Sequence, residues 1–171
     1  MRSVNNKGLP LTPVAGKESL IAASSILKGN HNKIDYGHIP SNVFTTPPLA
    51  SVGLTELEAK KQGINYMVNY EEMTSWFSYK RLKEPIAGFK VLVNKDTDQI
   101  IGAHLLRHHA EDIINIFAVA MNGNITGGQL KKTIFLAFPE LKRINIIICI
   151  ICQVSQFIAT KTLWNKKSMI L

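Results

Sequence analysis

The sequence predicts an α+β fold in which an antiparallel β-sheet carries helices on one face. Two apolar runs flank a turn-forming segment at residues 94–98, which indicates a β-hairpin over residues 88–106. A segment with one apolar face follows at residues 110–121 and predicts a helix. Upstream, three prolines exclude a helix from residues 39–52, so this stretch is expected to be extended. Consecutive strands with helices before and after them are typical of an α+β layer.

The N-terminal helix is expected to begin at Thr12. This residue is a suitable N-cap, and Pro13 suits the first helical position. Apolar residues follow at helical spacing, and Gly29 provides a typical helix end. Residues 30–38 are polar and are predicted to form a linker.

Short elements follow the proline-rich stretch. Thr55 is predicted to cap a short helix that has acidic residues in its first turn and lysines in its last, and Gly63 ends it. A strand is predicted over residues 66–70. In the hairpin turn, Asp98 is expected to accept a left-handed conformation. A second, shorter helix over residues 126–135 completes the expected order.

The composition is that of a globular protein, with 46% hydrophobic and 19% charged residues in a chain of 171. The net charge of +8 is concentrated near the C-terminus, where residues 129–171 carry seven Lys or Arg against one Glu. Because aromatic stacking residues do not alternate with this charge, we expect no nucleic-acid binding. The first ten residues lack the apolar core of a secretory signal, and the chain has two cysteines, which together predict a cytoplasmic location.

Residues 144–171 differ in kind from the rest of the chain. They contain no Gly, Pro, Asp, Glu or His, and residues 146–152 are all apolar. A membrane helix needs about 20 apolar residues, and polar residues at 153, 155 and 156 interrupt this run, so attachment to a membrane is the weakest interpretation. The run is typical of aggregation-prone segments, and deletion of residues 141–171 is expected to leave the α+β core folded. Its Ile, Asn and Lys bias also fits AT-rich coding DNA read out of frame.

Several ordered motifs carry a family resemblance. IPSNVFT at 39–45 and PLASVGLTE at 48–56 are followed by GFKVLV at 88–93, IGAHLL at 101–106 and HAE at 109–111. Together they resemble the C-terminal dimerisation domain of the flavin-dependent pyridine nucleotide–disulfide oxidoreductases, the family of glutathione reductase, mercuric reductase and dihydrolipoamide dehydrogenase. The upstream sequence GLPLTPVAG looks like the last helix of the FAD domain in that family.

The resemblance implies three parts. Residues 1–33 would be a remnant of the FAD-binding domain, residues 34–140 the dimerisation domain, and residues 141–171 a divergent apolar, basic tail. The implied partner is a second copy, giving a homodimer, or a full-length homologous subunit. The implied cofactor is FAD, through which the parent enzyme would pass electrons from NAD(P)H to a disulfide or a related substrate. The substrate, and the choice between NADH and NADPH, stay open.

The catalytic groups of the family are not matched in this chain, and no catalytic residue is assigned. No G-x-G-x-x-G loop occurs, so both nucleotide loops are missing. The only cysteine pair, Cys149 and Cys152, has the wrong place and spacing for the redox pair and is surrounded by isoleucines rather than cationic groups. Where the family has a His base before a proline, Phe138 precedes Pro139 and cannot transfer a proton.

Thr12 is the one residue whose position matches a cofactor contact. The resemblance implies that the positive end of its helix points at the flavin ring. An ordinary N-cap is the alternative. Just upstream, Arg2 and Ser3 stand in place of the Gly-Asp pair with which the family holds the ribityl chain of FAD.

The histidines are expected to be structural. His104 on a strand and His109 at a helix start match the family sequence. His108 and His109 are adjacent, but no carboxylate or cysteine completes a metal site at a known spacing, so no metal site is predicted. Arg107 stands where the family usually has glycine, which makes the local turn uncertain.

Two functions follow from these observations. The first is a truncated oxidoreductase whose dimerisation domain has no catalysis of its own. The second is a non-catalytic interaction module that pairs with itself or with a full-length homologue. Association is expected if the sheet face or the helix at 110–121 presents exposed apolar surface.

Overall fold

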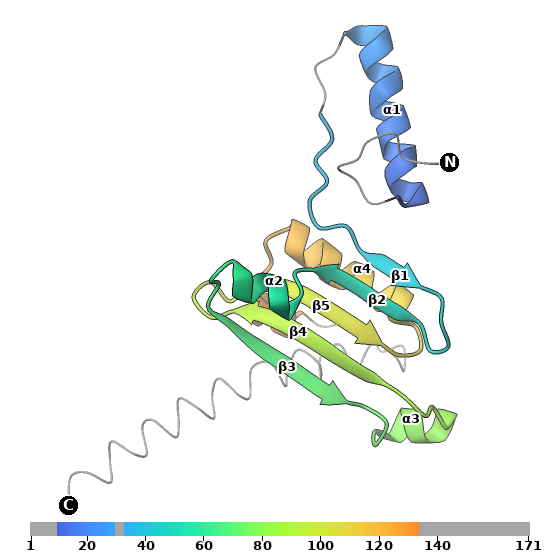
Figure 1. Ribbon diagram of the computed structural model, residues 1–171, viewed down its shortest axis with the longest axis vertical. Helices are drawn as coiled ribbons and strands as arrows, with labels where there is room; N and C mark the ends of the chain where they lie inside the picture. Colours follow the sequence, from blue (N-terminus) through green and yellow to red (C-terminus); the bar gives the residue numbers. More distant parts are fainter. Residues whose placement is uncertain (1–9, 30–32, 134–171) are drawn as a thin grey trace, which may run out of the picture.

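The computed structural model describes residues 10–29 and 33–133. These residues form a five-stranded sheet with helices around it (Figure 1). The elements in chain order are α1 (Thr12–Lys28), β1 (Ser41–Val43), β2 (Leu49–Gly53), α2 (Glu56–Lys61), β3 (Tyr66–Glu72), α3 (Phe77–Leu82), β4 (Gly88–Asn94), β5 (Ile100–Leu106), α4 (Ala110–Asn122) and α5 (Gly127–Lys132). The predicted α+β class with an antiparallel sheet is confirmed.

The sheet has the strand order β1-β2-β5-β4-β3, and all neighbouring strands are antiparallel. The predicted hairpin forms from β4 and β5, with Val91 opposite Ala103. Its turn closes through backbone hydrogen bonds between residues 94 and 98–99. Asp98 has a φ of 55°, which is the left-handed conformation expected from the sequence.

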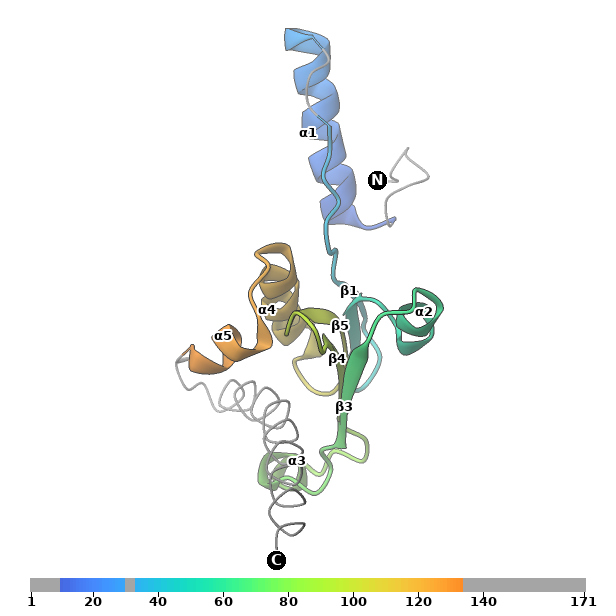
Figure 2. The ribbon, with the colours of Figure 1, turned by 90° about the vertical axis from the view of Figure 1, so that its left-hand side faces the viewer.

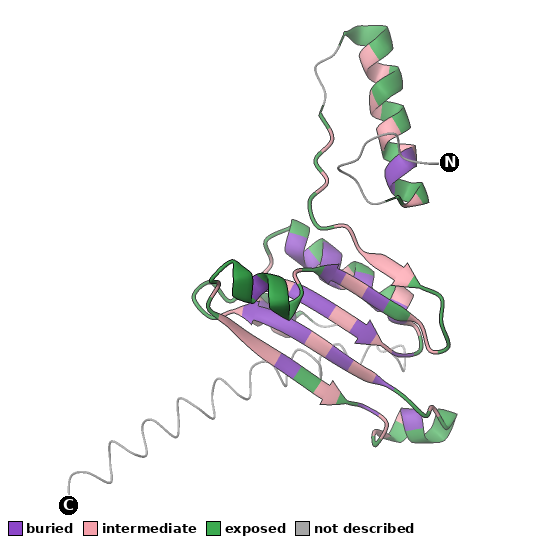
Figure 3. Ribbon diagram, in the orientation of Figure 1, coloured by how far each residue is buried: buried purple, intermediate pink, exposed green. Residues whose placement is uncertain are grey.

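The core lies between the sheet and α4. The apolar stripe of α4 packs mainly on β2 and β5. Directly paired residues on neighbouring strands share a face of the sheet, so Leu105 and its partners Ala50 and Phe89 all point toward this helix. Figure 3 shows the buried residues following these central strands and the inner side of α4. The full set of buried apolar residues in this cluster is Ala50, Val52, Met73, Tyr79, Ala87, Phe89, Val91, Val93, Ile100, Ala103, Leu105, Ala110, Ile113, Ile114, Phe117, Ala118, Ala120, Met121 and Leu130.

The short helix α2 lies on the side of the sheet opposite to α4 and α5 (Figure 2), so the helices do not all lie on one face as the sequence predicted. The chain reaches it by passing close over β5. A Cβ on Gly102 would meet the backbone oxygen of Leu54, and a Cβ on Gly53 would meet the backbone oxygen of Ile101 and the side chain of Met121. The small-residue run that ends β2 therefore allows two backbone segments to cross at close range.

Several boundaries differ from the sequence prediction. The residue at the N-cap of α1 is Leu11, and Thr12 is the first helical residue without a side-chain cap bond, so the predicted N-cap role of Thr12 is wrong. The extended stretch at 39–52 divides into two paired strands. Helix α3 was not expected, because its six residues carry no capping side chain that would mark its start. Within the described residues, no helix has the length and hydropathy of a membrane span.

Candidate functional site: an open sheet face

A row of polar side chains crosses the face of the sheet turned away from α4. The strand register places Ser51 opposite His104, His104 opposite Lys90, and Lys90 opposite Tyr70. Ser41 of β1 extends the row, with its hydroxyl 3.1 Å from that of Ser51. Since side chains alternate across a strand, these residues face away from the core that their neighbours form.

Two members of the row are tied to the connection that leads into α2. The Nε2 atom of His104 lies 3.1 Å from the backbone oxygen of Leu54. Lys90 Nζ lies 3.0 Å from Glu56 Oε2 and 6.0 Å from the ring centre of Tyr70. Because the Lys90 and Glu56 side chains are both partly exposed, this pair contributes at most about 1 kcal/mol to the free energy of unfolding. These contacts support the expectation that His104 is structural.

Next to this row lies a hollow of about 290 Å³. Its lining includes Leu49, Tyr70, Ile86 and Leu106 around the polar ends of Lys90 and His104. The side chains of Leu49, Tyr70 and Ile86 are exposed, as are those of Val43 and Phe44 near the end of β1. We call the combination of the polar row and this hollow the open face. It offers apolar contact area with a few polar groups, which is the usual composition of a protein interface.

Helix α4 presents a second, smaller candidate surface. Its apolar stripe is buried against the sheet, so the helix does not expose the whole face considered from the sequence. On its outer side, Val119 is 66% exposed and lies among the polar residues Asp112, Asn115 and Asn122. Exposed apolar side chains are therefore present both on the open face and on the outer side of α4.

The predicted cofactor residue Thr12 lies on α1, which stands apart from the sheet (Figure 1). Its helix N-terminus exists as predicted, although Leu11 provides the N-cap. Arg2 and Ser3 lie outside the described residues. Phe138, Cys149 and Cys152, on which the other expectations about catalysis depend, lie outside them as well.

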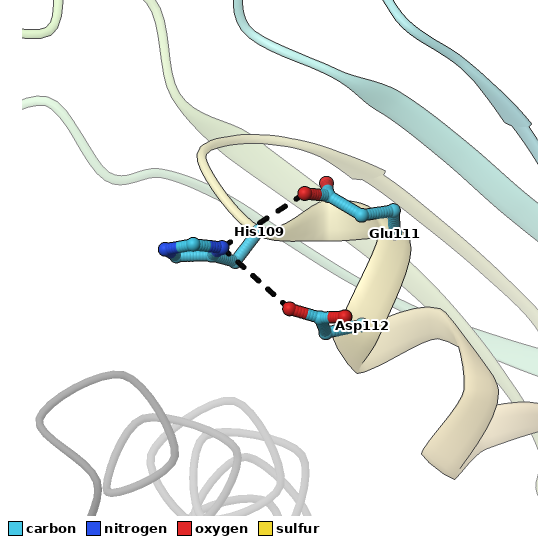
Figure 4. A group of neighbouring side chains, drawn as sticks. All are labelled: His109, Glu111 and Asp112. Atoms are coloured by element: carbon cyan, nitrogen blue, oxygen red, sulfur yellow. Dashed lines mark ion pairs between the residues drawn. The ribbon is translucent and has the colours of Figure 1, made fainter.

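Carboxylates surround the adjacent histidines at the start of α4, contrary to the prediction (Figure 4). His109 Nδ1 lies 3.8 Å from Glu111 Oε1 and 3.6 Å from Asp112 Oδ2. His108 Nδ1 lies 3.8 Å from Glu84 Oε1. The sequence comparison with known spacings missed this group because Glu84 comes from the distant segment after α3, and because Glu111 and Asp112 are brought round by the first helical turn.

The turn before α4 contains a buried arginine, Arg107, which the sequence did not predict. Its side chain is fully buried, with Nε donating to the backbone oxygen of His108 at 3.0 Å and the guanidinium 5.6 Å from the ring centre of Tyr79. Its backbone N–H donates to the oxygen of Pro48. The left-handed conformation that the turn requires falls instead on His109, which has a φ of 58°. No sequence pattern indicated a buried arginine here.

Comparison with known proteins decides the family. Residues 39–142 match the dimerisation domain of pyridine nucleotide-disulphide oxidoreductases. The chain belongs to this family. This chain is 52% identical over 132 residues to a 19.7 kDa protein of a mercuric resistance operon in Staphylococcus aureus, and the match covers 77% of this chain and 73% of that protein.

Full-length enzymes of the family match over a smaller share of their length. Dihydrolipoyl dehydrogenase from Bacillus subtilis is 34% identical over 140 residues, covering 82% of this chain and 29% of that enzyme. Mitochondrial dihydrolipoyl dehydrogenase 1 from Arabidopsis thaliana is 31% identical over 72% of this chain and 24% of its own length. Among solved structures, the flavoprotein disulfide reductase RclA from Escherichia coli superposes with a TM-score of 0.75 at 25% identity, over 84% of this chain and 33% of that one.

Proposed function

We propose that this chain serves as the dimerisation part of a flavin-dependent pyridine nucleotide–disulfide oxidoreductase and does not catalyse electron transfer by itself. The match of residues 39–142 to the dimerisation domain carries this proposal. The intact parent would pass electrons from NAD(P)H through FAD to a disulfide or a related substrate. The 171 residues contain no glycine-rich nucleotide loop, and Phe138 occupies the position of the family base, so this chain alone lacks the groups for that transfer.

FAD is the cofactor that we propose for the intact enzyme, with the N-terminal end of the Thr12 helix facing the flavin. A helix N-terminus can stabilise the anionic reduced flavin. One helix end cannot replace the pyrophosphate loop, and Arg2 and Ser3 do not supply the acidic residue that holds the ribityl chain. We therefore expect the isolated chain to be purified without FAD.

The partner that we propose is a second copy of this chain, and the alternative is a full-length homologous subunit. The open face supports pairing because it exposes Leu49, Tyr70 and Ile86 beside a hollow. Val119 on the outer side of α4 marks a second surface that could meet a partner. We further propose the division at 1–33, 34–140 and 141–171, a cytoplasmic location, and a role in the redox balance of the cell.

The experiment combines absorbance, activity and mass. The purified chain should show no flavin absorbance after denaturation and should not oxidise NADH or NADPH with disulfide substrates. Released flavin, or turnover that depends on Cys149 or Cys152, would contradict the proposal. Light scattering after size exclusion should give the mass of a dimer, or of a mixed dimer when a full-length homologue is added. A monomer under both conditions would contradict the pairing.

Charge substitutions locate the pairing surface. Leu49→Lys tests the open face and Val119→Lys tests the outer side of α4. Thr97→Lys is the matched control, because it adds the same charge at an exposed site in the turn between β4 and β5, at the end of the hairpin away from the hollow. The variant that shifts the mass toward the monomer identifies the surface, since a buried unpaired lysine opposes association. No shift in either test variant would exclude both surfaces.

A further inference from the structure

The group of side chains at the start of α4 has the geometry of a small metal site. His109 Nδ1, one oxygen of Glu111 and one of Asp112 all lie within 4.8 Å of one another (Figure 4). The imidazole nitrogen lies 3.8 Å from the Glu111 oxygen and 3.6 Å from the Asp112 oxygen. Zn²⁺ holds nitrogen and oxygen ligands at about 2.0–2.2 Å, which puts two ligands of one tetrahedral ion roughly 3.3–3.6 Å apart. Small side-chain adjustments would bring the three atoms onto one ion.

A second observation points to a cation at this place. Glu111 Oε2 and Glu84 Oε2 are both buried atoms without a hydrogen-bond partner. Each belongs to a carboxylate whose other oxygen faces one of the two histidines. The rings of His108 and His109 lie against each other, with their centres 3.9 Å apart. Two histidine–carboxylate pairs therefore lie side by side, and each contains a buried carboxylate oxygen with no hydrogen-bond donor, while the Glu84 and Glu111 side chains as wholes are 17% and 32% exposed.

The helix dipole alone does not account for this arrangement. Acidic residues in the first turn of a helix are stabilised by the exposed N–H groups, and Asp112, with a largely exposed side chain, fits that explanation. The same explanation predicts that the oxygens of Glu111 remain in water or bond to the helix end. A cation held between the carboxylates would instead offset the cost of the buried oxygen.

We propose that His109, Glu111 and Asp112 bind a divalent transition-metal ion, with the His108–Glu84 pair beside them. An imidazole with carboxylates suits ions of intermediate softness such as Zn²⁺, Ni²⁺ or Cu²⁺, whereas soft ions prefer sulfur ligands. Three protein ligands leave coordination positions for water. This site is separate from the open face, and Asp112 borders the outer side of α4 near Val119. The proposed metal binding does not depend on the proposed function.

Zn²⁺ titration of the full-length chain tests the proposal. Cys149→Ser and Cys152→Ser are introduced throughout, because thiolates would bind Zn²⁺ elsewhere. His109→Asn removes the imidazole and keeps a residue that tolerates a positive φ. Asp112→Asn removes a charged ligand at an exposed position. His38→Ala is the control, since it removes an exposed histidine whose backbone bonds to Asn122 at the opposite end of α4 from His109.

We expect one Zn²⁺ per chain, and an affinity that falls at least about ten-fold in His109→Asn and in Asp112→Asn, because loss of an outer partner alone typically costs 10- to 100-fold. His38→Ala should bind as the parent does. Circular dichroism of each variant shows whether the fold is retained. No binding by the parent chain, an unchanged affinity in folded His109→Asn and Asp112→Asn, or an equal loss in His38→Ala would each overturn the proposal.

Discussion

At the scale of single residues, the most informative side chain is Arg107. It is the largest fully buried side chain among the described residues. A buried guanidinium costs free energy unless hydrogen bonds and other favourable contacts replace its water. The oxygen of His108 and the face of Tyr79 supply two such contacts. The turn into α4 is therefore built around a buried cation.

Replacement of this side chain should destabilise the sheet domain. Arg107→Ala removes the hydrogen bond to His108 and the contact with Tyr79, and we expect a loss on the order of 2–3 kcal/mol in the free energy of unfolding. Arg81→Ala is the control, because Arg81 is exposed on α3 and should change stability by less than about 0.5 kcal/mol. Urea unfolding measures both. Equal stability of the two variants would show that the buried arginine contributes nothing.

Two glycines give a matched pair at the same scale. A Cβ at Gly102 would meet the backbone oxygen of Leu54, which cannot move without shifting the crossing segment. A Cβ at Gly16 on α1 would meet no atom within 4 Å. We expect Gly102→Ala to cost about 1–3 kcal/mol and Gly16→Ala to stabilise its helix by about 0.5–1 kcal/mol. Thermal unfolding measures both variants, and we expect a lower stability than wild type for Gly102→Ala and a higher one for Gly16→Ala.

At the scale of elements, α2 and α5 begin with the same capping box but with different chemistry. Thr55 and Glu58 satisfy each other's backbone N–H groups at α2, and Thr126 and Gln129 do so at α5. The hydrogen bonds from the Thr55 side chain and backbone lower the pKa of Glu58 below its usual value. The box at α5 uses a neutral amide, so acid does not affect it in this way.

This difference predicts a pH effect confined to α2. Because the folded-state pKa of Glu58 is lowered, its contribution to stability is present above the unfolded pKa and is lost as the pH falls through the folded pKa. The free energy of unfolding of the wild type should therefore exceed that of Glu58→Gln at neutral pH, and this difference should shrink as the pH falls. The difference in the free energy of unfolding between wild type and Gln129→Ala should stay constant from neutral to acidic pH. Unfolding measured from neutral to acidic pH decides it, and a constant difference for Glu58→Gln would refute the assignment.

At the scale of the whole molecule, Asn122 fastens the connection between α1 and the sheet at His38. The side chain of Asn122, at the end of α4, accepts a hydrogen bond from the His38 backbone N–H at 2.7 Å and donates one to the His38 backbone oxygen at 3.0 Å. A Cβ at Gly37 would meet the same side-chain oxygen. Asn122 therefore fixes where the chain from α1 joins the sheet domain.

Loss of the two hydrogen bonds between Asn122 and His38 should make the connecting segment more mobile without unfolding the sheet. We expect Asn122→Ala to be cut faster by proteases between residues 33 and 40, with little change in the unfolding of the core. Asn115→Ala serves as the control, since the Asn115 side chain donates its hydrogen bond to the backbone oxygen of Glu111 within the same helix. Limited proteolysis followed by mass spectrometry measures the cleavage. Equal cleavage rates in the two variants would show that the hydrogen bonds between Asn122 and His38 do not hold the connecting segment.

The sequence by itself determined the fold class, the hairpin, the apolar stripe of α4 and the family, because alternation, helical spacing and motif order are local patterns along the chain. Only the tertiary structure decided how distant segments meet. It placed Glu84 beside His108, Asn122 on the backbone of His38, and Leu54 over Gly102. It also buried Arg107 and moved the N-cap of α1 to Leu11. Some of these outcomes depend on contacts between residues far apart in the chain. The others depend on which of several adjacent residues takes a given backbone conformation. Local sequence patterns specify neither.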